Sequence, residues 1–243
     1  MRILGKVSYK GSRYQGWQKQ IDAPSVQETI EKALSQILNQ TISIQGSGRT
    51  DAGVHAKGQT FHFDIDKDVD LDRLNYSLNC LLPQDIYVLS LQKVDDDFHA
   101  RYSAKGKIYQ YDIHFGHRDV FHNEIEATIL QKCDISLLKE ALLQFIGKHD
   151  FKNFTSKEED ENQFMREIYD ISFIEKEDKL SIILKGNGFM RYMIRFMIGS
   201  AIAISQNKEN ISFIKEKLDS KKERNIVCYK APSEGLFLID VIY

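Results

Sequence analysis

Alternating apolar and polar residues predict a strand at the start of the chain, and a helical pattern follows it. Residues 3–9 alternate with a period of two, which is typical of a half-buried strand. Ser25 and Glu28 form a capping-box pattern just after Pro24, and apolar residues then recur at helical spacing up to about residue 39. We therefore predict a strand followed by a helix with one face in the core.

Two more strands, a helix and a further strand complete the first half of the chain. Residues 41–45 and 58–66 alternate as strands do. Asp70 then precedes a helical pattern that Pro83 ends, and residues 86–94 alternate again. The resulting order, β-α-β-β-α-β, is a known arrangement in which two helices cover one face of an antiparallel sheet.

The second half repeats this order without repeating the sequence. The predicted strands are residues 107–115, 168–175, 180–185 and 236–242, and the predicted helices are residues 134–146, 189–205 and, in addition, 211–218. We therefore predict an α+β fold of two β-α-β-β-α-β (ferredoxin/RRM-like) halves, residues 1–104 and 105–243. The halves would form one large, mainly antiparallel sheet with helices on one face and an active-site cleft on the other.

A loop punctuated by glycines, residues 46–56, lies between two of the predicted strands. It carries three glycines, which permit positive φ angles and close backbone approach, together with Arg49 and Asp51. A P-loop would need Lys before Ser or Thr and then a helix, and a dinucleotide-binding loop also needs the helix, whereas a strand follows here. Two interpretations stay open: a loop that serves a ligand, and a turn in which Asp51 bonds only its own backbone.

Composition narrows the classes of protein. The chain has 243 residues, three prolines and three widely spaced cysteines, so neither a flexible linker nor a disulfide framework nor a zinc site is indicated. The first residues follow a strand pattern rather than that of a signal peptide, and the longest apolar stretch, residues 196–204, is too short to cross a bilayer. We expect a cytoplasmic protein with no membrane partner.

The net charge of −2 does not by itself indicate a nucleic-acid binder, because binding depends on local patches. Acidic runs at residues 95–97 and 158–161 are interpreted as solvated faces. Basic residues stand in or beside the loop and the motifs described next. A locally positive surface is therefore compatible with the negative net charge of the chain.

Residues 48–56 read Gly-Arg-Thr-Asp-Ala-Gly-Val-His-Ala and resemble the catalytic signature of the tRNA pseudouridine synthase A family. Other segments agree with that family in order along the chain: residues 9–11 with 16–18, 98–101, 107–111, 186–189 with 193–195, and 231–232 with 235–236. The resemblance spans essentially the whole chain. Lys10 departs from it, because family members usually carry Asp there.

The resemblance implies an isomerase that converts uridine to pseudouridine at positions 38 to 40 in the anticodon stem-loop of tRNA, after flipping the base. It implies that Asp51 is the essential catalytic carboxylate, that Tyr109 stacks on the target base and that Arg195 is the basic partner of Asp51. The substrate-binding residues that it implies are Arg49, Thr50, His55, Arg101, Lys107 and Leu236. Asp51 would act as a nucleophile or as a stabiliser and base at the sugar, and the sequence favours neither route.

No cofactor is implied, since an isomerisation involves no redox change and no external group. The implied partner is tRNA, and family members act as homodimers that span one tRNA. His55 and His99 have no carboxylate or cysteine at ligand spacing, so we interpret them as hydrogen-bonded or RNA-contacting rather than as metal ligands.

Two alternatives from other classes stay open. A non-catalytic RNA-binding module could stack bases on Tyr109 and Tyr111 in the same architecture. It would need no unique aspartate in a rigid loop. A glycosidase could use Asp51 with a second acid such as Glu167, which would need the two carboxylates close together.

Overall fold

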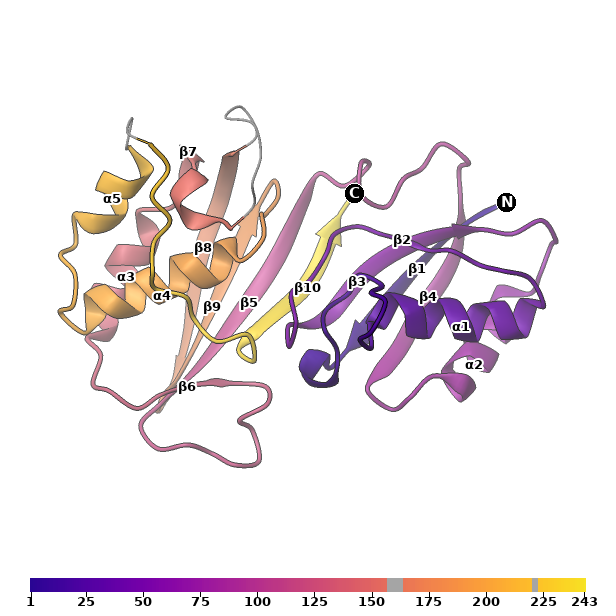
Figure 1. Ribbon diagram of the computed structural model, residues 1–243, viewed down its shortest axis with the longest axis horizontal. Coiled ribbons are helices and arrows are strands. Elements are labelled where there is room, and N and C mark those ends of the chain that lie inside the picture. The colour runs from indigo at the N-terminus through magenta and orange to yellow at the C-terminus, as the bar shows by residue number, and fades with distance from the viewer. Residues whose placement is uncertain (157–163, 220–222) are drawn as a thin grey trace. The chain divides into compact units, whose positions relative to one another are not determined.

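The computed structural model describes residues 1–156, 164–219 and 223–243, and the chain divides into two compact units (Figure 1). The first unit contains Met1–Lys105 and Phe237–Tyr243, and the second contains Gly106–Leu236. The sequence predicts residues 105–243 as one half, but the last strand groups with the first unit because it pairs with a strand there. The acidic run at residues 158–161 lies outside the described residues.

The strands of the first unit pair mainly antiparallel. They are β1 (Arg2–Tyr9), β2 (Gln45–Gly46), β3 (His55–Asp64), β4 (Ile86–Val94) and β10 (Leu236–Ile242), of which the first residue, Leu236, belongs to the second unit. β1 lies between β3 and β4 and is antiparallel to both, and the short β2 pairs with β3. β10 is the exception, because it runs parallel to β3, with Phe237 opposite His55.

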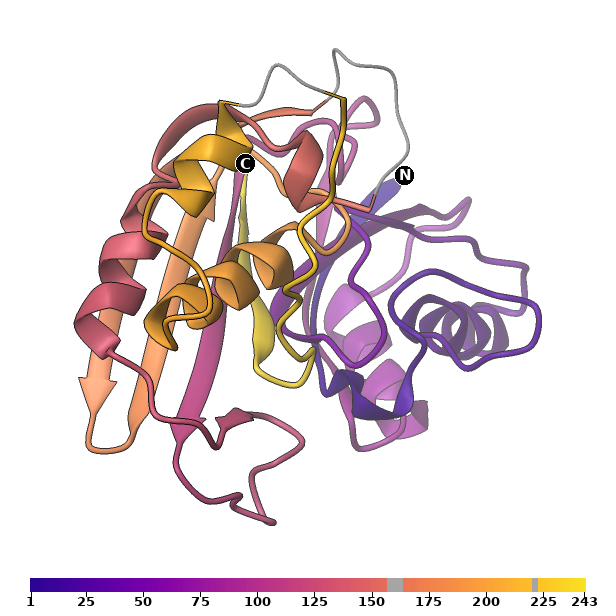
Figure 2. The same cartoon turned by 60° about the vertical axis from the view of Figure 1, so that its left-hand side comes forward.

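The two helices of this unit begin where local capping predicts. α1 (Val26–Leu38) starts at Ser25, whose Oγ accepts a hydrogen bond from Glu28 N at 3.2 Å. α2 (Leu71–Leu81) starts at Asp70, whose Oδ1 accepts hydrogen bonds from Asp72 N and Arg73 N, both at 3.0 Å. The helices contact each other, and α2 contacts β4 (Figures 1 and 2).

The predicted strand at residues 41–45 is mostly absent. Ile42 and Ile44 are buried, but their N–H groups donate to side chains of α1: to Ser35 Oγ at 2.9 Å and to Glu31 Oε1 at 3.0 Å, respectively. The alternation in this segment therefore reflects burial against a helix rather than pairing in a sheet. A buried backbone needs partners, and here helix side chains supply them.

The second unit is also mixed α/β. Its strands are β5 (Gly106–Phe115), β6 (Ala127–Ile129), β7 (Gly147–Asp150), β8 (Met165–Lys176) and β9 (Lys179–Gly186). β5, β9, β8 and β7 are antiparallel neighbours in that order, and β6 runs parallel to β5. β6 and β7 were not predicted. The mixed class with mainly antiparallel strands is confirmed, whereas the cleft and the single joint sheet stay predictions.

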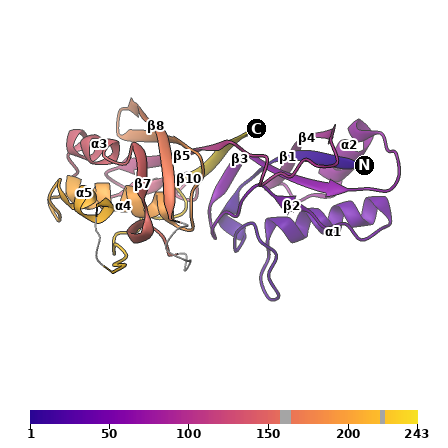
Figure 3. The same cartoon turned by 90° about the horizontal axis from the view of Figure 1, so that it is seen from above.

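The helices of the second unit are α3 (Ile135–Leu143), α4 (Met193–Ser205) and α5 (Phe213–Leu218). Each unit also has one short 3-10 turn, η1 (Gly11–Arg13) in the first and η2 (Lys152–Phe154) in the second. α3 and α4 pack together, and the three helices gather in one part of this unit (Figures 2 and 3). α4 begins four residues later than predicted, because Tyr192 has a left-handed φ of 59°. None of the helices in the described ranges is long and apolar enough to cross a membrane.

Candidate active site

The loop that carries Asp51, residues 47–54, packs against the first loop of the chain. Trp17 N donates to Thr50 O at 3.2 Å, and Gly53 N donates to Tyr14 O at 3.3 Å. Val54 N donates to Asp51 O at 3.1 Å and closes a turn in which Gly53 has a φ of 77°. Glycine adopts this angle without strain. The first loop, residues 10–18, therefore braces the Asp51 loop, a role that the sequence did not reveal.

Two glycines of the first loop allow this close packing. A Cβ on Gly11 would lie 2.0 Å from Val54 O, and a Cβ on Gly16 would lie 2.5 Å from Thr50 O. Gly16 also has a φ of +92°. Only glycine fits at this distance and this backbone angle, so both glycines are part of the site's construction.

A buried hydroxyl pair anchors the residue before Asp51. The hydroxyl oxygens of Tyr9 and Thr50 lie 2.8 Å apart, and both side chains are buried. Burial raises the pKa of the Tyr9 hydroxyl far above its usual value, more than the hydrogen bonds to Thr50 and Gln59 lower it. Tyr9 therefore stays protonated at any pH at which the protein works.

A second buried bridge holds the other end of the loop. Ser47 Oγ donates to Gln59 Oε1 at 2.6 Å, and Gln59 Nε2 donates to Gly48 O at 2.9 Å. Ser47 N in turn donates to Thr60 O at 2.8 Å. These bonds tie the loop to β3, so its backbone is fixed on both sides of Arg49 and Asp51.

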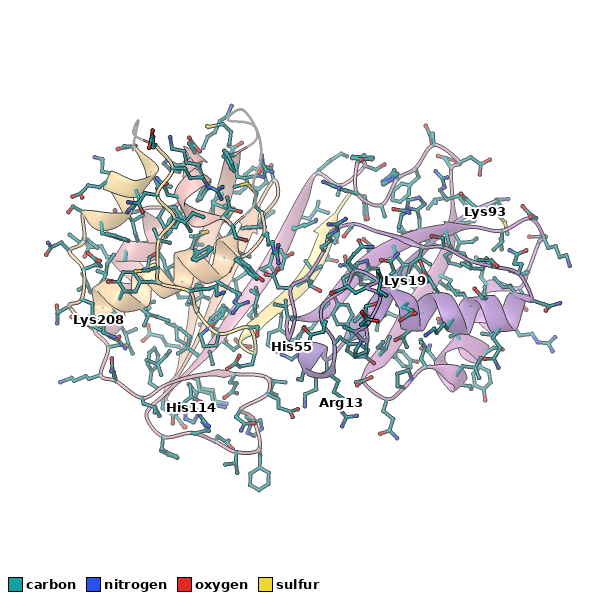
Figure 4. The ribbon with its side chains drawn as sticks, viewed as in Figure 1. Arg13, Lys19, His55, Lys93, His114 and Lys208 are labelled. Atoms are coloured by element: carbon teal, nitrogen blue, oxygen red, sulfur yellow. The ribbon has the colours of Figure 1, made fainter. Side chains whose placement is uncertain are left out.

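The predicted residues of this loop differ in exposure. Arg49 is exposed and Asp51 is half-buried, so both side chains are accessible. His55 is only 1% exposed: its Nδ1 accepts a hydrogen bond from Gly11 N at 3.0 Å, and its ring stacks on Phe237 with centroids 4.6 Å apart (Figure 4). Thr50 and His55 are thus both buried and hold the loop in place, while their predicted contact with a substrate stays a prediction.

The second unit carries Tyr109 and Lys107 on β5. Tyr109 is 8% exposed, and its ring meets the ring of Phe189 edge to face at 5.1 Å. Lys107 is half-buried and lies opposite Gly186 of β9. Leu236, at the start of β10, is 5% exposed. The aromatic and aliphatic side chains expected near a base are therefore present in one unit.

Arg195 is the one residue of α4 that is not buried. Its Nε donates to Ala231 O at 2.8 Å, while Ala231 N donates back to Arg195 O at 2.9 Å. Its guanidinium carbon lies 5.3 Å from the centroid of the Tyr192 ring. These two hydrogen bonds fix Arg195 at the one position of α4 that is not buried.

The predicted residues come from both units. Arg49, Thr50, Asp51, His55 and Arg101 belong to the first, and Lys107, Tyr109, Arg195 and Leu236 belong to the second. Glu167, the second acid of the glycosidase alternative, is exposed on β8 of the second unit. In the parts of the chain that the structure describes, no group of three or more His, Cys, Asp or Glu residues could hold a metal ion.

Sequence reasoning missed the residues that brace the loop. Four of these residues lie in segments that match the family pattern: Tyr9, Gly11, Gly16 and Trp17. The sequence therefore marks these segments but does not show what the residues do. No sequence pattern marks Gln59, because its hydrogen bonds depend on which residues the fold brings to β3.

Comparisons with known proteins agree along nearly the whole chain. A family model described as tRNA pseudouridine synthase matches residues 6–103 and 141–243. The tRNA pseudouridine synthase A of Staphylococcus aureus strain JH1 is 36% identical over 239 residues, which cover 98% of this chain and 89% of that protein. The protein of the same name from strain Newman gives the same identity and coverage.

Among solved structures, a chain of a Cbf5-Nop10-Gar1 complex matches with a TM-score of 0.38 and 12% identity. The match covers 83% of this chain and 54% of that chain. A likeness at this level carries no argument about fold or function.

Proposed function

Because the chain belongs to the tRNA pseudouridine synthase family, we propose that it converts uridine to pseudouridine at positions 38 to 40 of the anticodon stem-loop of tRNA, with Asp51 as the catalytic carboxylate. Membership of the family makes the chain an isomerase of tRNA processing. The observation that carries the proposal for Asp51 is its loop. The backbone is fixed on both sides and the neighbouring Thr50 is buried, while the carboxylate stays accessible.

The reaction breaks the bond between C1′ and N1, turns the uracil, and joins C5 to C1′ before the C5 proton leaves. All atoms stay within the nucleoside, apart from one proton released at C5 and one gained at N1. Asp51 serves either as a nucleophile or as a base at the sugar, where positive charge develops at C1′. Both routes need an ionised, oriented carboxylate.

The other roles follow the same proposal. Tyr109 stacks on the target base and assists the loss of the C5 proton, and Arg195 is the basic partner that keeps Asp51 ionised. Arg49, which is exposed beside Asp51, fills the space left by the flipped base. Arg101 and Lys107 contact the RNA backbone, and Leu236 contacts the base.

We also propose that the protein acts in the cytoplasm as a homodimer that binds one tRNA across both subunits. Sedimentation of the protein with and without tRNA tests this arrangement. Two chains per tRNA are expected, and one chain per tRNA at saturation would contradict it.

Replacing Asp51 by Asn tests the catalytic assignment. We expect pseudouridine formation to fall by at least ~10³-fold, the scale at which loss of a catalytic carboxylate acts in other enzymes. Affinity for tRNA and thermal stability should change little, because the substitution removes a charge but almost no volume. Release of the C5 hydrogen from tRNA labelled with tritium measures the reaction.

The control is Asp66→Asn, which neutralises an exposed carboxylate just after β3. This variant should keep the wild-type rate. Substantial activity in Asp51→Asn would overturn the assignment and favour an RNA-binding module without catalysis.

A further inference from the structure

Arg101 and Tyr102 stand side by side on the surface of the first unit. They lie in the segment between β4 and β5. The Tyr102 ring is 75% exposed, Arg101 is also exposed, and the guanidinium carbon lies 5.6 Å from the centroid of the ring. An arginine at this distance from a tyrosine face makes a cation–π contact. The pair therefore presents a flat aromatic surface with a fixed positive charge beside it.

His99 holds the backbone under this pair. Its Nδ1 accepts hydrogen bonds from the N–H groups of Arg101 at 3.1 Å and Tyr102 at 3.4 Å. Its own backbone exchanges two further bonds with Ser103, through the hydroxyl at 3.0 Å and the N–H at 2.9 Å. The His99 ring also lies 4.3 Å from the Tyr102 ring. The exposed ring is thus pre-positioned, which lowers the entropy cost of binding.

The turn is bonded to the body of the unit at three places. Ala100 N donates to His62 Nδ1 at 3.2 Å, Tyr243 OH donates to Ala100 O at 2.8 Å, and Arg2 Nη1 donates to Phe98 O at 2.9 Å. These partners come from β3, from the residue after β10 and from β1. The backbone that leads to Tyr102 is therefore fixed to the body of the unit.

We propose that Tyr102 is a stacking platform for an unpaired nucleobase of the RNA substrate, while Arg101 contacts a neighbouring phosphate. An aromatic ring with an adjacent cation is the usual means of binding single-stranded RNA, because every base has a face that can stack. The cation beside the ring fits RNA better than an apolar protein partner, since the exposed Arg101 lies 5.6 Å from the ring centroid. The inference rests on the proposed function for the identity of the RNA.

Binding measurements separate the two contributions. Tyr102→Leu should weaken binding of tRNA and of a short single-stranded oligouridine by about 5- to 150-fold, the range measured for stacking of one base. Its dependence of log Kd on log salt should match that of wild type. Arg101→Ala should instead reduce that slope by roughly one unit. Tyr102→Phe should restore binding, because it keeps the ring.

Tyr76 provides a matched control. It is 74% exposed on α2, and no ring or cation contact to it is found among the described residues. Tyr76→Leu should leave RNA affinity unchanged. If Tyr102→Leu also binds like wild type, the stacking role is wrong.

Fluorescence tests stacking directly. Tyr102→Trp adds an exposed indole to a chain whose Trp17 is buried, and saturating tRNA should quench its emission, whereas Tyr76→Trp should not respond. Equal responses of the two variants would overturn the proposal. A wild-type protein that binds the oligouridine but makes no pseudouridine would contradict the proposed function and leave the stacking test intact.

Discussion

Gly16 and Gly116 have similar backbone angles but different surroundings. Their φ angles are +92° and +102°, but a Cβ on Gly16 would lie 2.5 Å from Thr50 O, while a Cβ on Gly116 would meet nothing within 4 Å. The two positions therefore separate the cost of a left-handed angle from the cost of a steric clash.

We predict that Gly116→Ala lowers the free energy of unfolding by about 1–2 kcal/mol through backbone strain alone. Gly16→Ala should lose a further ~1–3 kcal/mol from overpacking and should also lower kcat, because the clash falls on the loop that carries Asp51. Urea denaturation and the tritium-release rate measure the two effects. Equal losses in both variants would show that the first loop does not brace the site.

At the scale of single residues, the family resemblance points to Asp51 as the proposed catalytic residue, but it does not show what supports that residue. Asp51 is recognised from nine consecutive residues, all of them local in the chain. The bond from Tyr9 to Thr50 joins positions 41 residues apart, and no pattern in either segment records it. Supporting residues of this kind become visible only when the fold is known.

Secondary-structure elements were predicted well where local chemistry sets their ends. α1 and α2 start at Ser25 and Asp70, whose side chains cap the helices. The start of α4 was wrong because tertiary contacts decide it: Tyr192 takes a left-handed angle, and Lys230 and Arg195 lie against its ring at 4.6 and 5.3 Å. Local propensity contains no information about Lys230, which stands 38 residues further along the chain.

Helix α4 offers a prediction in which packing should outweigh propensity. Alanine is intrinsically better than glycine in a helix by about 1 kcal/mol. A Cβ on Gly199, however, would lie 2.6 Å from Tyr229 O and 2.9 Å from Ala231 N. Gly199→Ala should therefore lower the unfolding free energy by about 1–3 kcal/mol and reduce activity, since Ala231 also holds Arg195.

The neighbouring Ser200 serves as the control. Its buried Oγ has no hydrogen-bond partner within the described ranges, so Ser200→Ala should be neutral or slightly stabilising. Thermal unfolding of both variants checks the pair. A Gly199→Ala protein more stable than wild type would mean that the segment around Tyr229 shifts easily to make room for the added Cβ.

For the whole molecule, the stability should depend on pH through His62. Burial, helped by the nearby His99 and Arg2, lowers the pKa of His62 from 6.5 to about 4. Between these values the unfolded chain binds a proton that the folded chain does not. The free energy of unfolding should therefore fall as the pH falls from 6.5 towards 4, by at most about 1.4 kcal/mol per pH unit.

Urea titrations between pH 7.5 and 4.5 measure this dependence, and His62→Asn supplies the comparison. The Oδ1 of asparagine matches the position of Nδ1 and can still accept the hydrogen bond from Ala100 N, but it does not titrate. The variant should lose this part of the pH dependence. Identical pH profiles for the two proteins would place the titrating group elsewhere.

The sequence does not predict to which unit the last strand belongs, and the reason is a different one. The alternation of residues 236–242 predicts a strand, and the strand is present. A hydrophobic pattern does not identify the pairing partner, so nothing indicated that β10 pairs with β3 and belongs with the first unit.

The pairing of β10 with β3 also has a consequence for biogenesis. Thr60, on β3, and Tyr243 share a hydrogen bond but stand 183 residues apart in sequence. A ribosome adding about 5–20 residues per second needs roughly 10–40 s to make the intervening chain. During that time His55 and Ala56 of β3, which pair with β10, form an unpaired strand edge that can pair wrongly with other chains, whereas β2 already pairs with Phe61 and His62. The loop with Asp51 is thus synthesised early but acquires its final neighbours late. The chain should therefore need chaperones most during this interval.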